Sequence, residues 1–256
     1  MADRPALPAG FRRRAFDAIP STNTEAFKTA RDGDPGNIWF TAAEQTEGRG
    51  RRGRVWVGAR GNMAASLLLI DPAPPANAAT ISFVAGVALH QAAIDAAGPA
   101  IAERLRLKWP NDLLLDRLKV AGISVEGDRL ADGRFIVVIG FGVNCVAHPE
   151  ADTIHPASDF DARGVPLAAE SLFERLAHRM ADELTRWDRG ENFRAIRGAW
   201  LARSAGLGEP IRVNLPERTI DGRFDSLDDD GRLVLTRLDG VREAVSAGDV
   251  FFGSGH

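Results

Sequence analysis

Residues 108–126 read KWPNDLLLDRLKVAGISVE, a stretch in which two short apolar runs lie on either side of Asp116-Arg117. The runs 113–115 and 119–126 are rich in residues that favour extended backbone. Asp116-Arg117 supplies the turn between them. The stretch therefore predicts a β-hairpin, and residues 104–109 just upstream predict a third strand.

Further strands and helices are expected on both sides of this hairpin. Strands are predicted over residues 14–19, 37–45, 63–70 and 135–143, the last following a turn at Asp132-Gly133. Helices are predicted over residues 23–30, 78–97 and 172–190, and a further helix carries Phe193, Ile196 and Trp200. Thr22 and Glu25 have the spacing of a capping box before the first helix. This mixture of elements indicates an α+β fold.

The pattern changes after Gly206. Residues 210–252 hold short strand-like runs, with Asp-Gly turns expected at Asp221-Gly222, Asp230-Gly231 and Asp239-Gly240. Closely spaced strands of this kind predict a small β-barrel. We therefore expect two domains, covering residues 1–206 and 207–256.

Composition narrows the class of protein. A net charge of −3 argues against a surface that binds nucleic acid over the whole protein. A single cysteine, Cys145, excludes an intramolecular disulfide and suits a reducing compartment. No segment approaches the roughly 20 apolar residues of a membrane helix, and no signal peptide is recognised. The cytoplasm is the expected location, without a membrane partner.

The segment Gly48–Arg54, GRGRRGR, precedes Val55-Trp56 and falls in a predicted loop over residues 46–62. Glycines let backbone amides approach an anion, and arginine offers a fork of donors that matches phosphate or carboxylate. Such a loop can hold a triphosphate or an acyl phosphate. A solvated basic loop or a nucleic-acid-binding arm has the same composition, so the segment alone leaves the choice open.

Other short motifs carry polar groups at predicted strand ends. Asp112, in KWPND, can hold Mg²⁺, although Pro, Asn and Asp are also ordinary turn residues. Lys119 opens a strand and can meet a carboxylate. GFGVN, at 140–144, can form a narrow backbone wall against a ligand, and STN, at 21–23, can bind a neutral polar ring or cap a helix. None of the five histidines is interpreted as a metal ligand.

Taken in this order, GRGRRGR-x-W, KWPND, K-x-AGI-x-VE and G-x-G-x-N resemble the biotin–protein ligases, closely over residues 14–144 and loosely in the C-terminal part. The resemblance implies a mixed β-sheet with helices on one side, followed by a small SH3-like barrel. Many relatives carry an N-terminal helix-turn-helix repressor domain. The catalytic pattern here begins within about twenty residues of Met1, so a ligase without operator DNA binding is expected.

The resemblance also implies roles for particular residues. Contacts to biotin are expected from Ser21, Thr22, Asn23, Gln45, Arg49, Gly50, Arg51, Lys119 and Gly122. Contacts to ATP or the adenylate are expected from Arg49, Arg51, Arg52, Trp56, Asn111, Asp112 and Asn144, with Asp112 also as a ligand of the metal. Lys119 and Arg51 are the expected catalytic residues, and residues 49–51 fall in a loop that the family orders around its ligand.

The implied reaction joins biotin to AMP with ATP and Mg²⁺, then passes biotin to a lysine of a biotin carboxyl carrier domain of acetyl-CoA carboxylase or a related enzyme. A lipoate–protein ligase with the same two steps is the nearest alternative. A non-enzymatic nucleic-acid-binding module is the alternative from another class. A homodimer paired at a sheet edge is left open.

Overall fold

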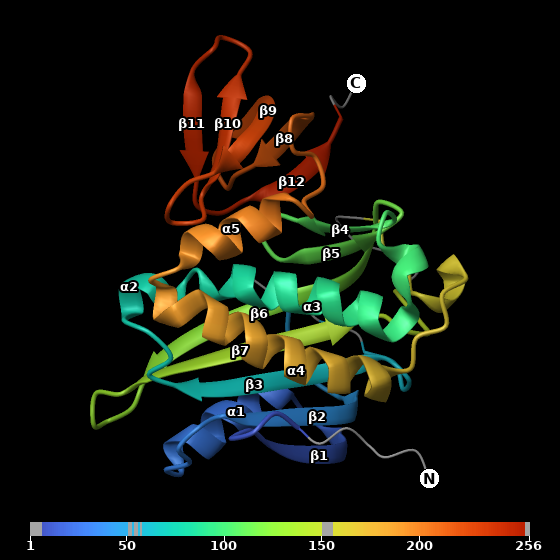
Figure 1. Cartoon of the computed structure of the whole chain (residues 1–256), viewed down its shortest axis with the longest axis vertical. Coiled ribbons are helices and arrows are strands. Elements are labelled where there is room, and N and C mark those ends of the chain that lie inside the picture. Colours follow the sequence, from blue (N-terminus) through green and yellow to red (C-terminus); the bar gives the residue numbers. More distant parts are fainter. Residues whose placement is uncertain (1–6, 51–52, 54–55, 57, 150–155, 254–256) are drawn as a thin grey trace.

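The computed structural model describes residues 7–50, 53, 56, 58–149 and 156–253, and it contains two sheets with helices packed around the larger one (Figure 1). The larger sheet has the strand order β1-β2-β3-β7-β6-β5-β4. Only β1 and β2 are parallel, so the sheet is mixed. Its strands are β1 Arg12–Ile19, β2 Ile38–Gln45, β3 Met63–Ile70, β4 Leu105–Lys108, β5 Asp112–Leu115, β6 Leu118–Arg129 and β7 Phe135–Val143.

Helices cover both faces of this sheet. The α-helices are α1 Thr22–Arg31, α2 Pro75–Ala78, α3 Ile81–Ala97, α4 Ala169–Trp187 and α5 Phe193–Leu201, with single 3₁₀ turns at Pro99–Ile101, Asp161–Arg163 and Asp188–Gly190. Helices α3, α4 and α5 lie on one face, as the sequence leads one to expect (Figure 1). The shorter α1 lies on the opposite face, where its apolar residues pack against β2, β3 and β7.

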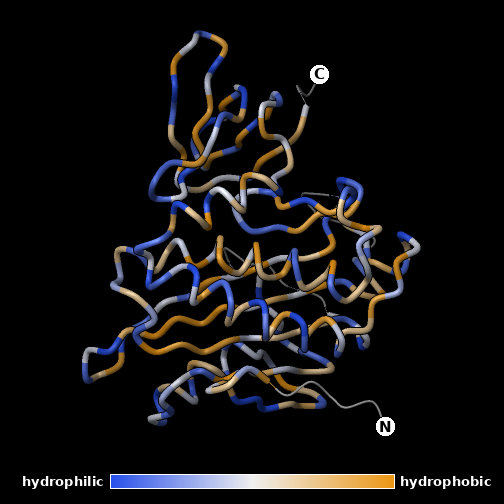
Figure 2. Tube along the Cα trace, in the orientation of Figure 1, coloured by the Kyte–Doolittle hydropathy of each residue, from blue (hydrophilic) through white to orange (hydrophobic). Residues whose placement is uncertain are grey.

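Successive apolar side chains of the central strands point to opposite faces of the sheet, so both faces become buried. In β2, Trp39 packs under α3 and α4, whereas Ile38 and Phe40 pack under α1. Successive side chains of a strand point to opposite faces, so a strand covered on both sides reads as a continuous apolar run. Figure 2 shows this apolar character along β3 and β7.

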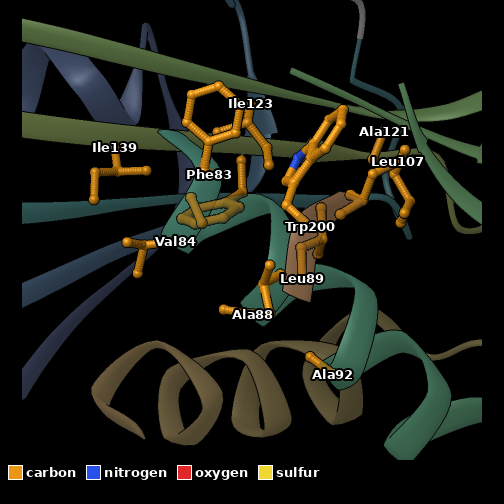
Figure 3. Packing of buried hydrophobic residues seen from close by; sticks show 14 of the residues in the cluster. Phe83, Val84, Ala88, Leu89, Ala92, Leu107, Ala121, Ile123, Ile139 and Trp200 are labelled. Atoms are coloured by element: carbon orange, nitrogen blue, oxygen red, sulfur yellow. The ribbon is translucent and has the colours of Figure 1, made fainter. Parts of the chain in front are cut away.

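The larger core forms between α3, α5 and the sheet. Phe83 of α3 meets Trp200 of α5 edge to face, with ring centroids 5.6 Å apart. Gly86 lets α5 approach α3 closely, because a Cβ there would lie 3.2 Å from Trp200 Nε1. Figure 3 shows these aromatic side chains beside Ile123 and Ile139 of the sheet. Helix α3 is therefore enclosed on nearly every side.

This enclosure explains one apolar segment. Among the described residues, Pro75–Ala97 is long and apolar enough to cross a membrane, but 72% of its most apolar window is buried inside the protein. The sequence argument that no segment approaches this length is wrong. Burial against the sheet and its neighbouring helices identifies the segment as a core helix.

The second sheet is antiparallel, with the strand order β11-β10-β9-β8-β12. Its strands are β8 Pro210–Asn214, β9 Thr219–Leu227, β10 Leu233–Arg237, β11 Arg242–Val245 and β12 Asp249–Phe252. The turn predicted at Asp221-Gly222 is wrong, since both residues lie inside β9. Gly222 is there because β10 passes close by: a Cβ would lie 2.5 Å from Leu235 Cδ1 and 2.7 Å from Thr236 O. The chain turns instead after Leu215, whose amide donates to Arg218 O.

The Asp116-Arg117 hairpin is confirmed. Both residues have positive φ, 50° and 67°, as a tight two-residue turn requires. The register pairs Lys108 with Asp112 and Leu105 with Leu115 across β4 and β5. Asp112 is thereby fixed at the sheet end where its strand begins.

Two buried groups have pKa values well away from their ordinary range. Burial raises the pKa of the Cys145 thiol to about 11. His90, on α3, is 3% exposed, and its Nε2 lies 3.3 Å from Leu105 O. Burial, aided by the nearby Arg203 and Arg106, lowers the pKa of His90 to about 4. The folded protein therefore holds this imidazole neutral.

His90 makes stability depend on pH. Its pKa is near 6.5 when unfolded and about 4 when folded, so the stability it contributes is present above pH 6.5 and is lost as pH falls towards 4. The loss amounts to roughly 3 kcal/mol. We expect His90→Gln, which keeps a donor, to flatten this part of the pH dependence of urea unfolding. Equal slopes for both proteins between pH 6.5 and 4 would contradict the assignment.

Candidate active site

The centre of the large sheet carries small residues on three adjacent strands. Two successive rungs across β3, β7 and β6 are formed by Ser66–Gly140–Ser124 and Ala64–Gly142–Gly122. We call these six residues the small-residue floor. They lie on the face of the sheet that carries α1, since Asn23 of α1 touches the first rung. Their short side chains leave backbone open to close approach.

The start of α1 presents polar groups to this floor. Ser21 caps the helix, its Oγ accepting from Thr24 N at 3.4 Å. The prediction that Thr22 is the cap is wrong, because Thr22 is already the first helical residue. Its amide and hydroxyl both donate to Gln45 Oε1, at 2.8 and 3.0 Å. Capping by Ser21 leaves the Thr22 hydroxyl available to this second contact.

Asn23 links α1 to both outer strands of the first rung. Its Oδ1 lies 2.5 Å from Ser66 Oγ, and its Nδ2 donates to Ser124 Oγ at 3.2 Å and to Glu126 Oε1 at 2.5 Å. Gly140 lies between the two serines, and a Cβ there would come within 2.6 Å of Asn23 and Ser124. The first rung is thus lined by buried, uncharged donors and acceptors, with one carboxylate at its edge.

A cation lies beside the second rung. Lys119 Nζ is 2.7 Å from Asp112 Oδ1, and a Cβ on Gly122 would lie 3.5 Å from Lys119 Nζ. The Asp112 side chain is 8% exposed and that of Lys119 is 25% exposed. The ammonium therefore keeps access to solvent while its carboxylate partner does not. Asn111 fixes the preceding turn by donating from Nδ2 to Ile123 O at 2.6 Å.

Trp56, which follows the glycine- and arginine-rich segment, lies over the floor. Trp56 N donates to Gly48 O at 2.9 Å, which joins the two ends of the loop. The Trp56 ring lies directly on the second rung, where a Cβ on Gly142 would overlap it. Lys119 Nζ is 5.9 Å from the centre of the same ring. Trp56, Gly122 and Lys119 therefore lie close together in the structure.

Arg49, from the same loop, reaches the edge of the first rung. Its Nη2 donates to Thr24 Oγ1 at 3.2 Å and lies 3.8 Å from Glu126 Oε2. Gly50 follows it in the chain, and Arg51 and Arg52 lie outside the described residues. Among the described loop residues, Arg49 and Trp56 thus reach the two rungs separately.

Asn144, an expected contact of the adenylate, lies just beyond the end of β7. It is 2% exposed, its Nδ2 donates to Ser158 O at 3.1 Å, and its amide donates to Val120 O. Asn62 binds the next residues of the chain: its Oδ1 accepts from the amides of residues 145–147. Asn62 therefore ties the end of the loop to the end of β7.

Several residues of the site were not found in the sequence. Ser66 is the single polar residue of the buried strand β3, and that isolation was the available signal. Ser124 lies in the partly buried strand β6, which holds other polar residues, so it carried no such signal. Glu126 lies inside a quoted motif but was given no role. Lys108 lies in the predicted strand over residues 104–109 and was given no role, yet it is 4% exposed.

The described residues do not provide a built magnesium site. Asp112, the predicted ligand, is neutralised by Lys119 at 2.7 Å. No group of three or more His, Cys, Asp or Glu side chains able to hold a metal occurs among the described residues. A hard divalent cation needs several oxygen ligands, which would have to come from elsewhere.

Two family profiles and several known proteins match the sequence of this chain. Residues 15–144 match the profile of the biotin/lipoate A/B protein ligase family, and residues 206–253 match the biotin protein ligase C terminal domain. The biotin–[acetyl-CoA-carboxylase] ligase of Paracoccus denitrificans is 42% identical over 91% of this chain and 97% of its own length. The enzyme of that name from Mycobacterium tuberculosis is 32% identical over 95% and 91%.

A solved structure agrees with the fold. Biotin protein ligase from Aquifex aeolicus, in complex with biotin and ATP, superposes with a TM-score of 0.77 at 22% identity, covering 94% of this chain and 99% of that one. The family profile covers the strands and the helix that build the floor, and the C-terminal profile covers the second sheet. The chain therefore belongs to the biotin/lipoate A/B protein ligase family.

Proposed function

We propose that this protein is a biotin–protein ligase, which activates biotin with ATP as biotinyl-5'-AMP and transfers it to a lysine of a biotin carboxyl carrier domain. The observation that carries the proposal is the pairing of two chemistries on one floor. A buried, uncharged hydrogen-bonding rung lies next to a rung beside an ammonium. Successive same-face residues of a strand are about 7 Å apart, a span suited to an acid with a polar ring at the far end of a short chain.

The first rung suits the ureido ring of biotin, which is neutral and offers N–H donors and a carbonyl acceptor. Thr22, Asn23, Ser66 and Ser124 supply complementary hydroxyl and amide groups. Their positions are fixed by one another and by Gln45. Buried polar groups of this kind discriminate strongly, because a ligand without matching groups leaves them unpaired.

The second rung suits the reacting carboxylate. Biotin and ATP are both anions, so their approach requires positive charge in a site with little water. Lys119 supplies an ammonium, and Asp112 holds it at the edge of the floor. A carboxylate oxygen of biotin then attacks the α-phosphorus of ATP. The bond to the pyrophosphate oxygen breaks, and pyrophosphate leaves with that electron pair.

Transfer completes the reaction. The neutral amine of the acceptor lysine attacks the acyl carbon of biotinyl-5'-AMP and loses a proton, and the acyl–oxygen bond breaks to release AMP. No side-chain nucleophile is required. Trp56, lying on Gly142 and Gly122, covers the rung where the anhydride would form and limits its contact with water.

Mg²⁺ enters this scheme with the nucleotide. We propose that ATP phosphates supply most of its oxygen ligands, since Asp112 is engaged by Lys119 and the described residues offer no carboxylate cage. When bound, the ion would supply positive charge beside the pyrophosphate. The role of the protein is to place cationic side chains such as Lys119 beside the phosphate charge that remains.

Other parts of the proposal extend beyond the chemistry. The acceptor is a carboxyl carrier domain of acetyl-CoA carboxylase or a related carboxylase, and the working place is the cytoplasm. Residues 1–206 and 207–256 act as a catalytic and a C-terminal domain. A lipoate ligase is disfavoured because lipoate needs an apolar tunnel in place of the hydrogen-bonding first rung.

Pyrophosphate exchange tests the function directly. The protein, ATP and Mg²⁺ should exchange labelled pyrophosphate when biotin is added and not when lipoate is added. A carrier domain should then become labelled by radioactive biotin. Exchange that depends on lipoate, or salt-sensitive nucleic-acid binding without any exchange, would replace the proposal with one of its alternatives.

The Lys119–Asp112 pair gives a first mutational prediction. Lys119→Ala should lower biotin-dependent exchange by about a hundredfold, because one charged group is lost where charge develops. Asp112→Asn should lower it by roughly tenfold, since the ammonium remains but loses its ionic partner. Lys28→Ala, at an exposed position on α1, serves as the control. Near-normal exchange by Lys119→Ala would reject the role.

The first rung gives a second prediction. Gly140→Ala places a methyl group within 2.6 Å of Asn23 and Ser124, so one of them must move. The KM for biotin should rise by roughly tenfold, the equivalent of one misplaced hydrogen bond, while the KM for ATP changes little. Gly198→Ala is the control, because a Cβ there meets nothing within 4 Å. An equal rise for both substrates would contradict a ring-binding rung.

Arg51, assigned through the family resemblance, gives a third prediction. Arg51→Gly should weaken the hold on the activated intermediate, so that biotinyl-5'-AMP escapes into solution. Chromatography of the small molecules released during turnover measures this escape. Release at the wild-type rate would show that Arg51 has no part in retaining the intermediate.

A further inference from the structure

Lys108 is a buried lysine that has no part in the scheme above. Lys108 ends β4 and pairs across the hairpin with Asp112, so both side chains project from the same side of β4 and β5. Lys108 is 4% exposed. A buried ammonium is expensive unless anions or rings surround it, so its surroundings require an explanation.

The second sheet provides part of those surroundings. Lys108 Nζ lies 5.8 Å from the ring centres of both Phe251 and Phe252, which belong to β12. Figure 1 shows β12 beside β4 and β5. The next residue, Trp109, donates from Nε1 to Gly231 O at 3.2 Å. The turn that carries Asp112 is therefore held by the C-terminal sheet at two successive positions.

Lys108 has charged neighbours of both signs. Asp112 and Asp249 favour its ammonium, whereas Lys119 opposes it. Burial outweighs the two carboxylates and lowers the pKa of Lys108 to about 8. Asp112 thus has a lysine on each side: Lys119, which faces the floor, and Lys108, which faces the second sheet.

Lysine is rare in this chain, so its occurrence at position 108 calls for a physical reason. The chain contains 32 basic residues, of which only three are lysines: Lys28, Lys108 and Lys119. Two of the three therefore flank one carboxylate. Lysine is a compact point charge and its pKa shifts readily on burial, whereas arginine stays charged and needs more room. The space between Asp112 and the rings of Phe251 and Phe252 therefore suits a compact cation.

We infer that Lys108 is a positioning residue for the adenylation reaction: its ammonium, held by Phe251 and Phe252 of the C-terminal sheet, fixes Asp112 so that Asp112 can aim Lys119 at the reacting carboxylate and phosphate. This inference rests on the proposed ligase function. It makes the C-terminal sheet a supporting part of the adenylation site, contributing rings that never touch the substrates.

Lys108→Met tests the inference, since it removes the charge and keeps the length. The kcat for biotin-dependent pyrophosphate exchange should fall by about tenfold or more, with the KM for biotin changed less than twofold. The wild-type kcat/KM should decline as pH rises through about 8, and this decline should be absent in the variant. Wild-type kcat in Lys108→Met overturns the inference.

Thermal unfolding separates a positioning role from a structural one. A buried charge replaced by an apolar side chain of similar size often stabilises the fold, so Lys108→Met should melt at a higher temperature than wild type at pH 7. A lower melting temperature overturns the inference whatever the activity. If the wild type shows no biotin-dependent exchange, the proposed function fails. The melting comparison then still tells whether the buried charge of Lys108 destabilises the fold.

Phe252→Leu tests the aromatic support without touching the lysine. It should lower kcat for exchange and shift the alkaline decline to lower pH, because a ring that favours the ammonium is gone. Phe224→Leu, in the core of the same sheet, is the matched control and should leave kcat unchanged. Equal losses in both variants would reduce the effect to general weakening of the C-terminal sheet and overturn the inference.

Discussion

Close approach to the sheet at Gly140 and Gly142 is the constraint on which the site depends. A Cβ at Gly140 would collide with Asn23 and Ser124, and one at Gly142 would overlap the Trp56 ring. Because both positions lack side chains, α1 and the Trp56 ring rest directly on strand backbone. The two rungs then offer different chemistry within one span of β7: neutral hydrogen bonding at the first and a cation at the second.

Charge is arranged around a carboxylate that the solvent barely reaches. Asp112 binds Lys119 at 2.7 Å and is paired in register with Lys108, and Phe251 and Phe252 close the far side of Lys108. These contacts form a series that leads from the second sheet, through Lys108 and Asp112, to Lys119 and the floor. The second sheet, which begins about ninety residues downstream of Lys119, thereby supports from behind the group that meets the anionic substrates.

Much of this could be predicted from the amino-acid sequence, for physical reasons. The strand over residues 63–70 and the tight turn at Asp116-Arg117 are confirmed because apolar runs and turn residues act locally. The cap of α1 was misassigned, since Ser21 and Thr22 are both good caps and only the contact of Thr22 with Gln45 decides between them. Asp221-Gly222 was misread because its glycine serves the approach of another strand. Ser66 and Lys108 were missed because their roles depend on partners far away in the chain.

One detail of the core bears on how the protein can be handled. Cys145 is the only cysteine in the chain, it is buried, and its pKa is raised to about 11. At neutral pH this sulfur is almost wholly protonated and shielded, so maleimides and air oxidation should spare it. A cysteine introduced on an exposed surface could then carry a fluorophore or spin label by itself, without first removing the native thiol.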